Sequence, residues 1–403
     1  MLTPAEAEKL ILASLPLAGS EDCPLAEAQG RILHREIRAD RDLPPFDRVT
    51  MDGYALRSET LAAGGRTFRV IGIQAAGMIP LKLGARGDAC VEIMTGAVRP
   101  AGADCVVPYE DTSRDGATIT VAEGAAKKIL AGFAIHRRGS DHAAFDLIVP
   151  VGTRLGGREL AAAAACGCET LSVASRPKIA VIATGDELVE PGMPVAPHQI
   201  RRSNDYGLRA ALIAAGYPGV ERFHLRDVRE EIEHRLWHIL AEFDAVLLTG
   251  GVSKGKFDYL PVVLEALQVK KIFHGVAQRP GKPMWYGISP RRTPVFALPG
   301  NPAASYICAH RYILPALTRA SGAAEKPQQM LPLAEAVTFA PPLAYFLPVR
   351  LESNGRGMTA ARPDPINTSG DFSGLIGTDG FVELPADQKE FPAGYLAAFR
   401  PWI

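Results

Sequence analysis

Three glycine-rich segments carry residue types that could bind a charged ligand, and each follows a run of apolar residues. They read ATGDELVEPG, TGGVSKGKFDY and LPGNPAASY, beginning at residues 183, 249 and 298. Successive backbone N–H groups in such loops form anion-binding nests, and the N-terminus of a following helix adds its dipole. The sequence therefore predicts a site for a phosphate or another oxyanion.

The second segment is the richest in candidates for this site. Its strand ends at Gly250 and Gly251, and Ser253 with two lysines follows. Asp258 could cap the next helix or hold a metal ion, and the spacing alone does not decide between them. The segment lacks the G-x-x-x-x-G-K-[ST] spacing of a P-loop, so ordinary nucleotide triphosphate binding is not indicated.

The first segment places two acids, Asp186 and Glu187, side by side after a strand. Repulsion between neighbouring carboxylates raises a pKa unless a cation intervenes. A bound Mg²⁺ would explain the pair, because hard oxygen ligands suit this ion, and a solvated pair of loop acids is the alternative.

Cations are presented on stiff backbone elsewhere. In AQRPGKPMW, Arg279 and Lys282 bracket a Pro-Gly turn, an arrangement suited to an oxyanion, although Pro-Gly turns are also common structural devices. Pro299, Gly300 and Pro302 stiffen the third glycine-rich segment, and Asn301 is expected to cap the helix after it.

These loops need a parallel sheet to bring them together. Apolar runs at 178–184, 244–251 and 293–300 predict buried strands. Helices are expected at Asp205–Ala215, Val228–Phe243, Tyr259–Leu267 and Pro302–Ala320. Alternating strands and helices indicate a doubly wound α/β domain, in which ligands bind beyond the carboxyl ends of the strands.

Other elements surround this domain. Pro4–Leu15 is predicted as a helix with a Thr3–Glu6 capping box, and Leu25–Ala39 and Gly157–Cys168 as further helices. Short strands separated by Gly and Pro fill residues 68–130, and strands return after Lys326. We predict four domains: a discontinuous helical one (1–44 and 141–175), an inserted β domain (45–140), the α/β domain (176–325) and a C-terminal β domain (326–403).

Composition narrows the class of protein. The 403 residues carry 44 basic and 44 acidic side chains, so no surplus of positive charge favours general nucleic-acid binding. The N-terminus has no basic and apolar leader pattern, and no apolar run is long enough for a membrane span. The six cysteines show no zinc spacing and are expected to be reduced and mostly buried, which indicates a soluble cytoplasmic protein.

A proline-rich stretch, DLPPFDRVTMDGYAL (Asp42–Leu56), remains unexplained by these elements. Two consecutive prolines exclude a regular helix, and the low Gly and Ser content is unlike a flexible linker. We expect a stiff loop that presents Asp47 and Asp52 toward a cleft.

Seven short motifs occur in a fixed order along the chain, and together they are specific enough to indicate a family. They are PPFDRVTMDGYA, MTGA with GADCVVPYE, RRGSD, TGDEL, TGGVSKGKFDY, RPGKP and LPGNP. This set closely resembles the molybdopterin molybdenumtransferases (MoeA-type), the family that includes the E domain of gephyrin, over nearly the whole chain.

The resemblance implies a reaction and a fold. Molybdate would be inserted into adenylylated molybdopterin with release of AMP, in the presence of Mg²⁺. It implies an elongated homodimer with a helical N-terminal domain, an inserted β domain, a central three-layer α/β domain resembling molybdopterin adenylyltransferases, and a C-terminal β-barrel-like domain. The Asp52 loop of one subunit would face the α/β domain of the other, and transient contact with an adenylyltransferase and with cofactor-accepting proteins is expected.

The resemblance also implies site residues. The catalytic set carried over by motif is Asp52, Thr95, Asp141, Glu187, Asp227 and Asp258, and Asp52 and Glu187 are assigned to metal or water. Arg279, Lys282 and the TGGVS loop are assigned to phosphate and AMP. Arg279 stands where the family often has lysine, and Gly275 stands where some members have a second lysine.

Two other functions stay open on the sequence alone. One is a molybdopterin adenylyltransferase, since the central domain looks alike, and the other is a non-catalytic scaffold protein. The choice between molybdate and tungstate stays open as well, because both are tetrahedral oxyanions of nearly equal size.

Overall fold

The structure is a computed structural model that describes residues 1–252, 259–353, 355 and 357–403. The chain divides into two compact units. Unit 1 comprises residues 1–35, 151–156 and 170–403, and unit 2 comprises residues 36–150 and 157–169. Each unit is described by itself below.

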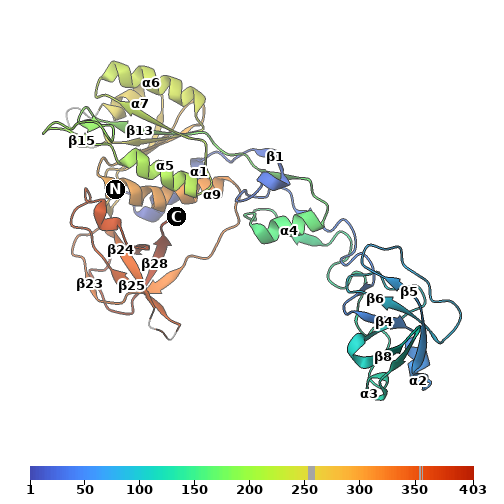
Figure 1. Ribbon diagram of the computed structural model, residues 1–403. Helices are drawn as coiled ribbons and strands as arrows, with labels where there is room; N and C mark the ends of the chain where they lie inside the picture. The colour runs from blue at the N-terminus through green and yellow to red at the C-terminus, as the bar shows by residue number, and fades with distance from the viewer. Residues whose placement is uncertain (253–258, 354, 356) are drawn as a thin grey trace. The chain divides into compact units, whose positions relative to one another are not determined.

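Unit 1 is centred on a six-stranded sheet with strand order β16-β13-β17-β21-β20-β18 (Figure 1). The first four strands in this order are parallel, and β20 and β18 add an antiparallel edge. The strand bounds are β13 Ile179–Thr184, β16 Val220–Leu225, β17 Ala245–Thr249, β18 Lys270–His274, β20 Trp285–Ile288 and β21 Pro294–Leu298. The predicted doubly wound domain is confirmed, with a mixed edge.

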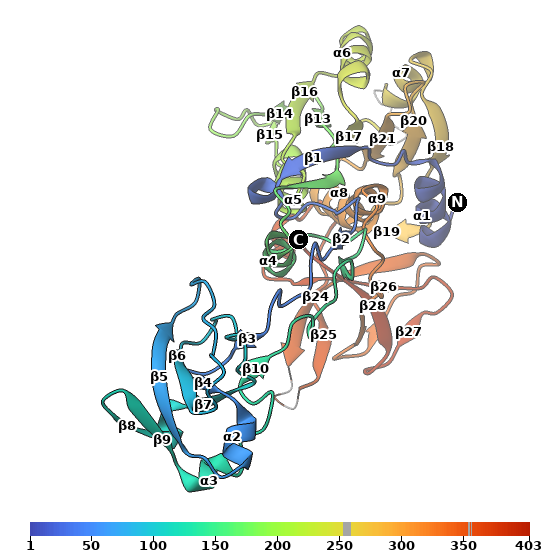
Figure 2. The ribbon, with the colours of Figure 1, turned by 90° about the vertical axis from the view of Figure 1, so that its right-hand side faces the viewer.

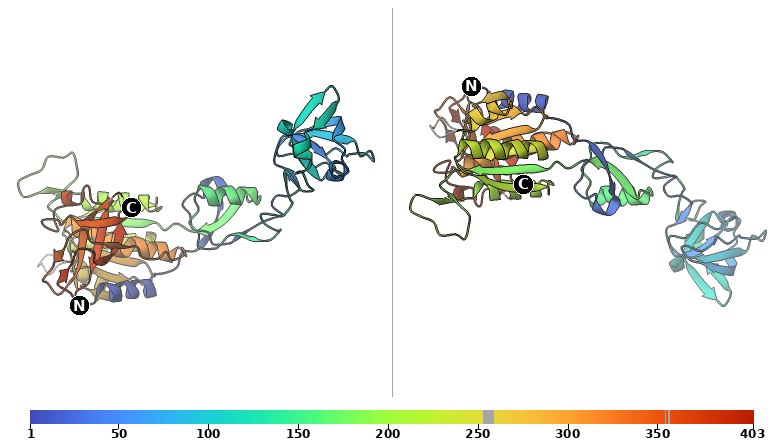
Figure 3. Two further views of the ribbon diagram at one scale, coloured as in Figure 1. Left: turned by 90° about the horizontal axis from the view of Figure 1, so that it is seen from below. Right: turned by 90° about the horizontal axis from the view of Figure 1, so that it is seen from above.

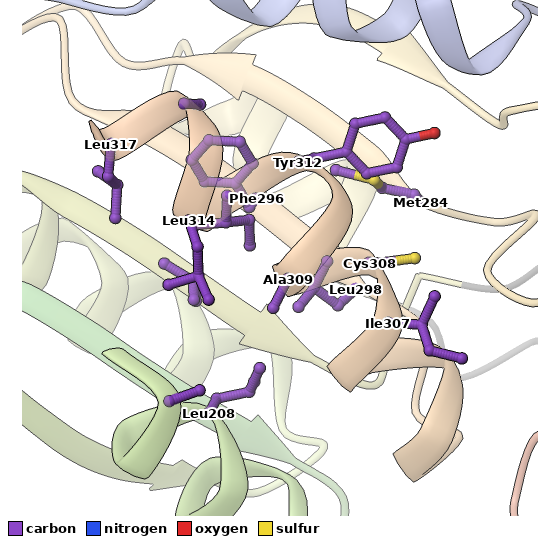
Figure 4. Packing of buried hydrophobic residues seen from close by; sticks show 14 of the residues in the cluster. Leu208, Met284, Phe296, Leu298, Ile307, Cys308, Ala309, Tyr312, Leu314 and Leu317 are labelled. Atoms are coloured by element: carbon purple, nitrogen blue, oxygen red, sulfur yellow. The ribbon is translucent and has the colours of Figure 1, made fainter. Parts of the chain in front are cut away.

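Helices cover both faces of this sheet. α6 (Arg229–Glu242) and α7 (Leu260–Ala266) pack on one face through a core that includes Leu236 and Val263. α5 (Asn204–Ala214), α8 (Pro302–Cys308) and α9 (Leu314–Ala320) pack on the other. Figure 4 shows apolar side chains from α5, α8 and α9 gathered against Phe296 and Leu298 of β21.

The N-terminal helix packs into the same apolar core as α5, α8 and α9. α1 (Pro4–Ser14) begins with the predicted capping box, in which Glu6 N–H donates to Thr3 Oγ1 (3.3 Å) and Thr3 N–H to Glu6 Oε2 (2.8 Å). Its buried residues Ala7 and Ile11 face the core beside α9. This prediction from sequence is confirmed.

The predicted helix over Leu25–Ala39 is wrong. The helical part of this segment is a short 3-10 turn, η1 (Leu25–Glu27), and its end forms the strand β2 (Ile37–Arg38). The segment follows β1 (Ser20–Pro24), which pairs with β12 (Thr170–Ala174). Leu33 N–H donates to Thr153 O (2.9 Å) and His34 N–H donates to Ser172 O (2.8 Å). The backbone groups of this segment are therefore satisfied by distant chain rather than by a helix.

A second sheet lies in the C-terminal part of unit 1, as Figure 2 shows below α8 and α9. Its strand order is β19-β24-β26-β28-β22, with β25 beside β24. The bounds are β19 Gln278–Arg279, β22 Met330–Pro332, β24 Ala344–Ser353, β25 Thr359–Pro363, β26 Gly380–Leu384 and β28 Leu396–Pro401. β23 (Val337–Thr338) pairs with β27 (Glu390–Phe391), and η4 (Ser373–Leu375) is a 3-10 turn.

One loop of unit 1 stands clear of the α/β sheet. It joins β14 (Leu188–Val189) to β15 (Ile200–Arg201), and Figure 3 shows it extending away from the helices. Arg202 at its base contacts Glu190 (2.7 Å) and Asp205 (2.5 Å), and Arg222 also reaches Asp205 (3.0 Å). Ion pairs between elements thus fix the base of the loop that begins with the TGDEL motif.

The helical run from Pro302 to Ala320 contains a π-helical segment, η3 (Ala309–Ile313). Within it His310 is 4% exposed and packs against the rings of Tyr306 (tilted) and Trp402 (edge to face), with ring centroids 4.4 and 5.1 Å away. Burial lowers the pKa of His310 to about 4. The folded protein therefore holds a neutral imidazole that the unfolded chain would protonate near pH 6.5.

We expect this histidine to make the folded protein less stable as the pH is lowered. The unfolded state binds the extra proton between pH 6.5 and about 4, so stability is present above pH 6.5 and is lost as the pH falls. Between pH 7 and pH 5 the loss from this group is about 2 kcal/mol. Urea unfolding at both pH values should show a smaller difference for His310→Gln than for wild type, and equal differences would contradict the assignment.

Unit 2 contains the predicted inserted β domain, which forms a six-stranded sheet with strand order β7-β4-β6-β5-β9-β8. The bounds are β4 Gly53–Leu56, β5 Thr67–Gln74, β6 Ala89–Ile93, β7 Cys105–Pro108, β8 Thr112–Asp115 and β9 Thr118–Val121. The short helices are α2 (Ser58–Ala62), α3 (Glu123–Ala126), η2 (Tyr109–Asp111) and α4 (Gly157–Ala165). Two small ladders pair β2 (Ile37–Arg38) with β11 (Leu147–Val149) and β3 (Arg48–Val49) with β10 (Ile135–His136).

The prediction of reduced, mostly buried cysteines is confirmed. All six thiols are free; five are buried and Cys168 is partly exposed. Over the described parts of the chain, no helix is both long enough and apolar enough to cross a membrane.

Candidate active site

Asp52 and Thr95 form a polar pair on the surface of unit 2. Asp52 immediately precedes β4 and Thr95 lies two residues after β6, and these strands are antiparallel neighbours. Asp52 Oδ1 accepts hydrogen bonds from the backbone N–H of Thr95 (2.6 Å) and from its Oγ1 hydroxyl (2.7 Å). These bonds lower the pKa of Asp52, so the carboxylate is charged at neutral pH.

The proline-rich loop before Asp52 is held by its other aspartates. Asp42 Oδ2 accepts from Arg138 Nε (2.7 Å), and Asp42 Oδ1 accepts from Ala144 N–H (2.9 Å). Asp47 Oδ1 accepts from Arg138 N–H (3.0 Å) and Asp47 Oδ2 from Arg99 Nε (2.9 Å). The expectation that Asp47 faces a cleft is therefore corrected, because both of its oxygens anchor the loop and only Asp52 remains exposed.

Asp141 has a hydrogen-bond partner, His136, that no sequence motif indicated. His136 Nε2 lies 2.9 Å from Asp141 Oδ1, and His136 Nδ1 lies 3.2 Å from Arg48 Nη2. The five-residue spacing within HRRGSD was the only local signal for this contact, and it is too general to have identified the pair.

In unit 1, the three glycine-rich loops meet at the carboxyl ends of their strands. A Cβ atom added at Gly300, after β21, would lie 3.6 Å from Cα of Gly250, after β17. A Cβ at Gly250 would lie 2.8 Å from the carbonyl oxygen of Thr184, the last residue of β13. Gly250 and Gly251 have φ of +92° and +63°, a conformation that favours glycine. The predicted convergence is confirmed for these residues.

The acids of the TGDEL motif have separate surroundings. Asp186 Oδ1 accepts from Arg226 Nε (3.4 Å) and from Asp227 N–H (3.3 Å), so a protein cation already accompanies this carboxylate. Glu187 is exposed, and its carboxylate folds back over Gly185, where an added Cβ would lie 2.5 Å from Oε2. Of this pair, Glu187 is the acid available to a ligand. Asp227 is placed beside Asp186 through its backbone.

The predicted cations are exposed at the edge of the same unit. Arg279 lies in β19, which pairs with β24, and Lys282 follows the turn at Gly281. Gly281 has φ of +95° and would clash with Cys308 if it carried a side chain. At Gly275 φ is +93°, and the Met1 side chain lies 3.7 Å from an added Cβ, so this backbone would strain a lysine.

The third loop differs from expectation at Asn301. The residue occupies the N-cap of α8, with Pro302 opening the helix, but its side chain makes no capping bond. Asn301 Nδ2 donates instead to Ser369 Oγ (2.6 Å), and Asn204 Nδ2 donates to Gly300 O (2.7 Å). Neither Asn204 nor Ser369 was predicted as part of the site. Ser253 and Asp258 lie outside the described residues.

Three family profiles match the chain in order. Residues 2–167 match the MoeA N-terminal region (domain I and II), residues 180–319 a probable molybdopterin binding domain, and residues 330–402 the MoeA C-terminal region (domain IV). A molybdopterin molybdenumtransferase of Synechocystis sp. is 38% identical over 408 residues and covers 100% of both chains. This chain belongs to the molybdopterin molybdenumtransferase family.

Further relatives agree with this family. A molybdopterin molybdenumtransferase of Synechococcus elongatus is 35% identical over 393 residues, covering 95% of this chain and 94% of the relative. The crystal structure of the molybdopterin biosynthesis MoeA protein from Pyrococcus horikosii has a TM-score of 0.82 and 31% identity, covering 100% of this chain and 99% of that one. The multi-domain α/β and β fold predicted from sequence is therefore confirmed. The four domain boundaries stay a prediction.

The family implies a bound Mg²⁺, for which side chains among the described residues are candidate ligands. The described residues contain no group of three or more His, Cys, Asp or Glu side chains that could hold a metal ion. Mg²⁺ does not require one, because it commonly keeps several waters and binds through one or two carboxylates plus substrate phosphates. Asp52 meets this need, since its Oδ2 has no hydrogen-bond partner among the described residues, and so does the exposed Glu187.

Proposed function

We infer that this protein inserts molybdenum into adenylylated molybdopterin with release of AMP, the final step of molybdenum cofactor biosynthesis. The observation that carries the inference is the match over the full length of both chains to a relative with the name molybdopterin molybdenumtransferase. The meeting of Gly250 and Gly300 at the carboxyl ends of β17 and β21 supplies a suitable place for the phosphates.

The proposed roles follow from charge and exposure. Gly250 and Gly251 offer backbone N–H groups to phosphate, and Arg279 and Lys282 add positive charge, since both are exposed. Pro299 and Pro302 hold the third loop in place. Asp52, paired with Thr95, would order a metal ion or a water rather than bind molybdate itself, because a carboxylate repels an oxyanion.

A direct assay tests this function. Purified protein is incubated with adenylylated molybdopterin, with and without molybdate, and released AMP is measured. We expect molybdate-dependent AMP release. If AMP were absent under all conditions while ATP and molybdopterin gave the adenylylated product, the adenylyltransferase alternative would hold. No turnover of either substrate would favour the scaffold role.

We expect the reaction to need a divalent cation. Mg²⁺ held by Asp52 and Glu187 would neutralise charge on phosphate and molybdate oxygens. Treatment with EDTA should lower AMP release at least roughly 10²-fold, and added Mg²⁺ should restore it. AMP release at the full rate in EDTA would remove the metal from this proposal.

We also propose a homodimer in the cytoplasm. The free cysteines fit a reducing compartment. In the dimer, the surface bearing Asp52 would complete the site on the α/β domain of a second copy, as the family resemblance implies. Transient contact with an adenylyltransferase and with cofactor-accepting proteins is proposed on the same ground.

A further inference from the structure

A cluster of four side chains in unit 2 lies directly behind the Asp52–Thr95 pair. We call it the tyrosine–glutamate clamp, and its members are Tyr54 on β4, Glu92 on β6, Tyr109 on η2 and Arg114 on β8. Figure 1 shows β4 and β6 as neighbours in this unit, and Tyr54 is the register partner of Glu92 across the two strands.

Glu92 is the centre of the clamp. Its side chain is 13% exposed, and both of its oxygens are used. Tyr109 OH donates to Oε1 (2.9 Å) and Arg114 Nη1 donates to Oε2 (2.7 Å). The rings of Tyr54 and Tyr109 meet edge to face at 5.3 Å. Both oxygens of Glu92 thus have a partner from another element.

The clamp is a poor source of stability for a small sheet. The Glu92 carboxylate is mostly buried and loses water, whereas the Arg114 side chain is 43% exposed, so their ion pair gains little stability over apolar residues of similar volume. The neighbouring core residues Leu56, Phe68 and Val107 show that the same unit builds ordinary apolar packing. The clamp therefore needs a reason other than stability, and a fixed geometry is what buried polar networks provide when every member is satisfied.

The clamp is tied to both halves of the Asp52–Thr95 pair. Tyr109 N–H donates to the backbone oxygen of Asp52 (3.3 Å), whereas the hydroxyl of the same residue binds Glu92, three residues before Thr95. Tyr109 thus connects the beginning of β4 to the end of β6. The fit is tight, because a Cβ added at Gly53 would lie 2.0 Å from Val107 O and 2.9 Å from Cα of Pro108.

The electrostatics agree with this geometry. Burial raises the pKa of Tyr109, and the nearby charge of Glu92 raises it further, with smaller contributions from Tyr54 and Asp52. The hydroxyl stays protonated at neutral pH and is a permanent donor to Glu92. The hydrogen bond from Tyr109 to Glu92 is therefore present at neutral pH, where Asp52 is also ionised.

We propose that Tyr109 and Glu92 are positioning residues for the proposed molybdenum insertion, which hold Asp52 and Thr95 at the separation and angle that the reaction requires. The proposal rests on the proposed function and adds residues that touch no substrate themselves. Its physical basis is that Asp52 and Thr95 lie at the ends of two different strands, β4 and β6, and the clamp connects side chains of those strands close to these ends.

The test removes single atoms of the clamp. Tyr109→Phe deletes one hydroxyl and keeps the ring, and it should lower kcat for AMP release about 10-fold with KM for adenylylated molybdopterin unchanged within 2-fold. KM is expected to hold because the phosphate-binding glycines lie in unit 1. Glu92→Gln keeps an acceptor for Tyr109 and should retain most of kcat, whereas Glu92→Ala should lose as much as Tyr109→Phe or more.

A matched control separates positioning from stability. Losing the Tyr109 hydrogen bond and shortening Ile129 to Val in the same apolar cluster should each lower the free energy of unfolding by a small and similar amount. Ile129→Val should leave kcat within 2-fold of wild type. Equal loss of kcat in Ile129→Val and Tyr109→Phe, or wild-type kcat in Tyr109→Phe, would overturn the proposal. Failure of the proposed function itself looks different, because wild-type protein would then release no AMP.

Discussion

Asp52→Ala abolishes AMP release from adenylylated molybdopterin while the protein stays folded. We expect a loss of roughly 10³-fold, because Asp52 is the exposed carboxylate of the pair with Thr95 and its Oδ2 is open to a metal ion or water. The side chain is exposed, so the free energy of unfolding should change little. AMP release and urea unfolding measure the two quantities.

Asp47→Ala is the matched control, because it removes the same side chain from the same loop. Asp47 is about one-third exposed and accepts hydrogen bonds from Arg99 and Arg138. These bonds hold the pKa of Asp47 below its usual value, so the charged form stabilises the fold. We expect this variant to lose about 1–3 kcal/mol of unfolding free energy. If Asp52→Ala unfolded like Asp47→Ala, or kept wild-type turnover, the assignment of Asp52 would be wrong.

Mixing two inactive variants restores activity if the site is shared between subunits. Asp52→Ala removes the carboxylate of unit 2, and Glu187→Ala removes that of unit 1. In a dimer with one chain of each kind, one of the two sites would carry both acids. Because half of the randomly mixed dimers are of this kind, activity should return to roughly a quarter of wild type.

The experiment needs subunit exchange, followed by the AMP assay. Each variant is refolded alone and with the other, and sedimentation verifies that dimers have formed. Asp52→Ala mixed with Asp52→Asn serves as the control, since no arrangement of those chains regenerates an acid at that position. Mixed chains that stay as inactive as their parents, or a protein that sediments as a monomer, would exclude a site shared between copies.

Much of unit 1 could be predicted because its signals are local. The apolar run at 178–184 forms β13, and the capping box at Thr3 opens α1, since each depends on residues within a few positions. The segment Leu25–Ala39 was misassigned because its apolar spacing resembles that of a helix. Its actual partners, such as Thr153 and Ser172, are more than a hundred residues away, and pairing at that distance leaves no local trace.

The residues of the candidate site also divide into those that local motifs predict and those that only the folded chain brings together. Motifs identified Asp52, Thr95 and the three glycine loops, whereas the partners that fix them were missed. Asn301 was expected to cap its own helix, but its amide reaches Ser369, 68 residues on. The contact of Glu92 with Arg114 also joins strands that are separated in sequence. Side-chain contacts of this kind are set by the packed fold, so one sequence does not reveal them.

The path of the chain around Arg279 has a consequence for how the protein can be divided. β18 and β20 belong to the α/β sheet, but β19 between them leaves that sheet and pairs with β24 of the C-terminal sheet, with Arg279 opposite Tyr345. A fragment that ended near residue 325 would keep the two cations and lose the strand that holds them. We therefore expect that the α/β sheet, moved into another protein, keeps Arg279 in place only if the C-terminal sheet is moved with it.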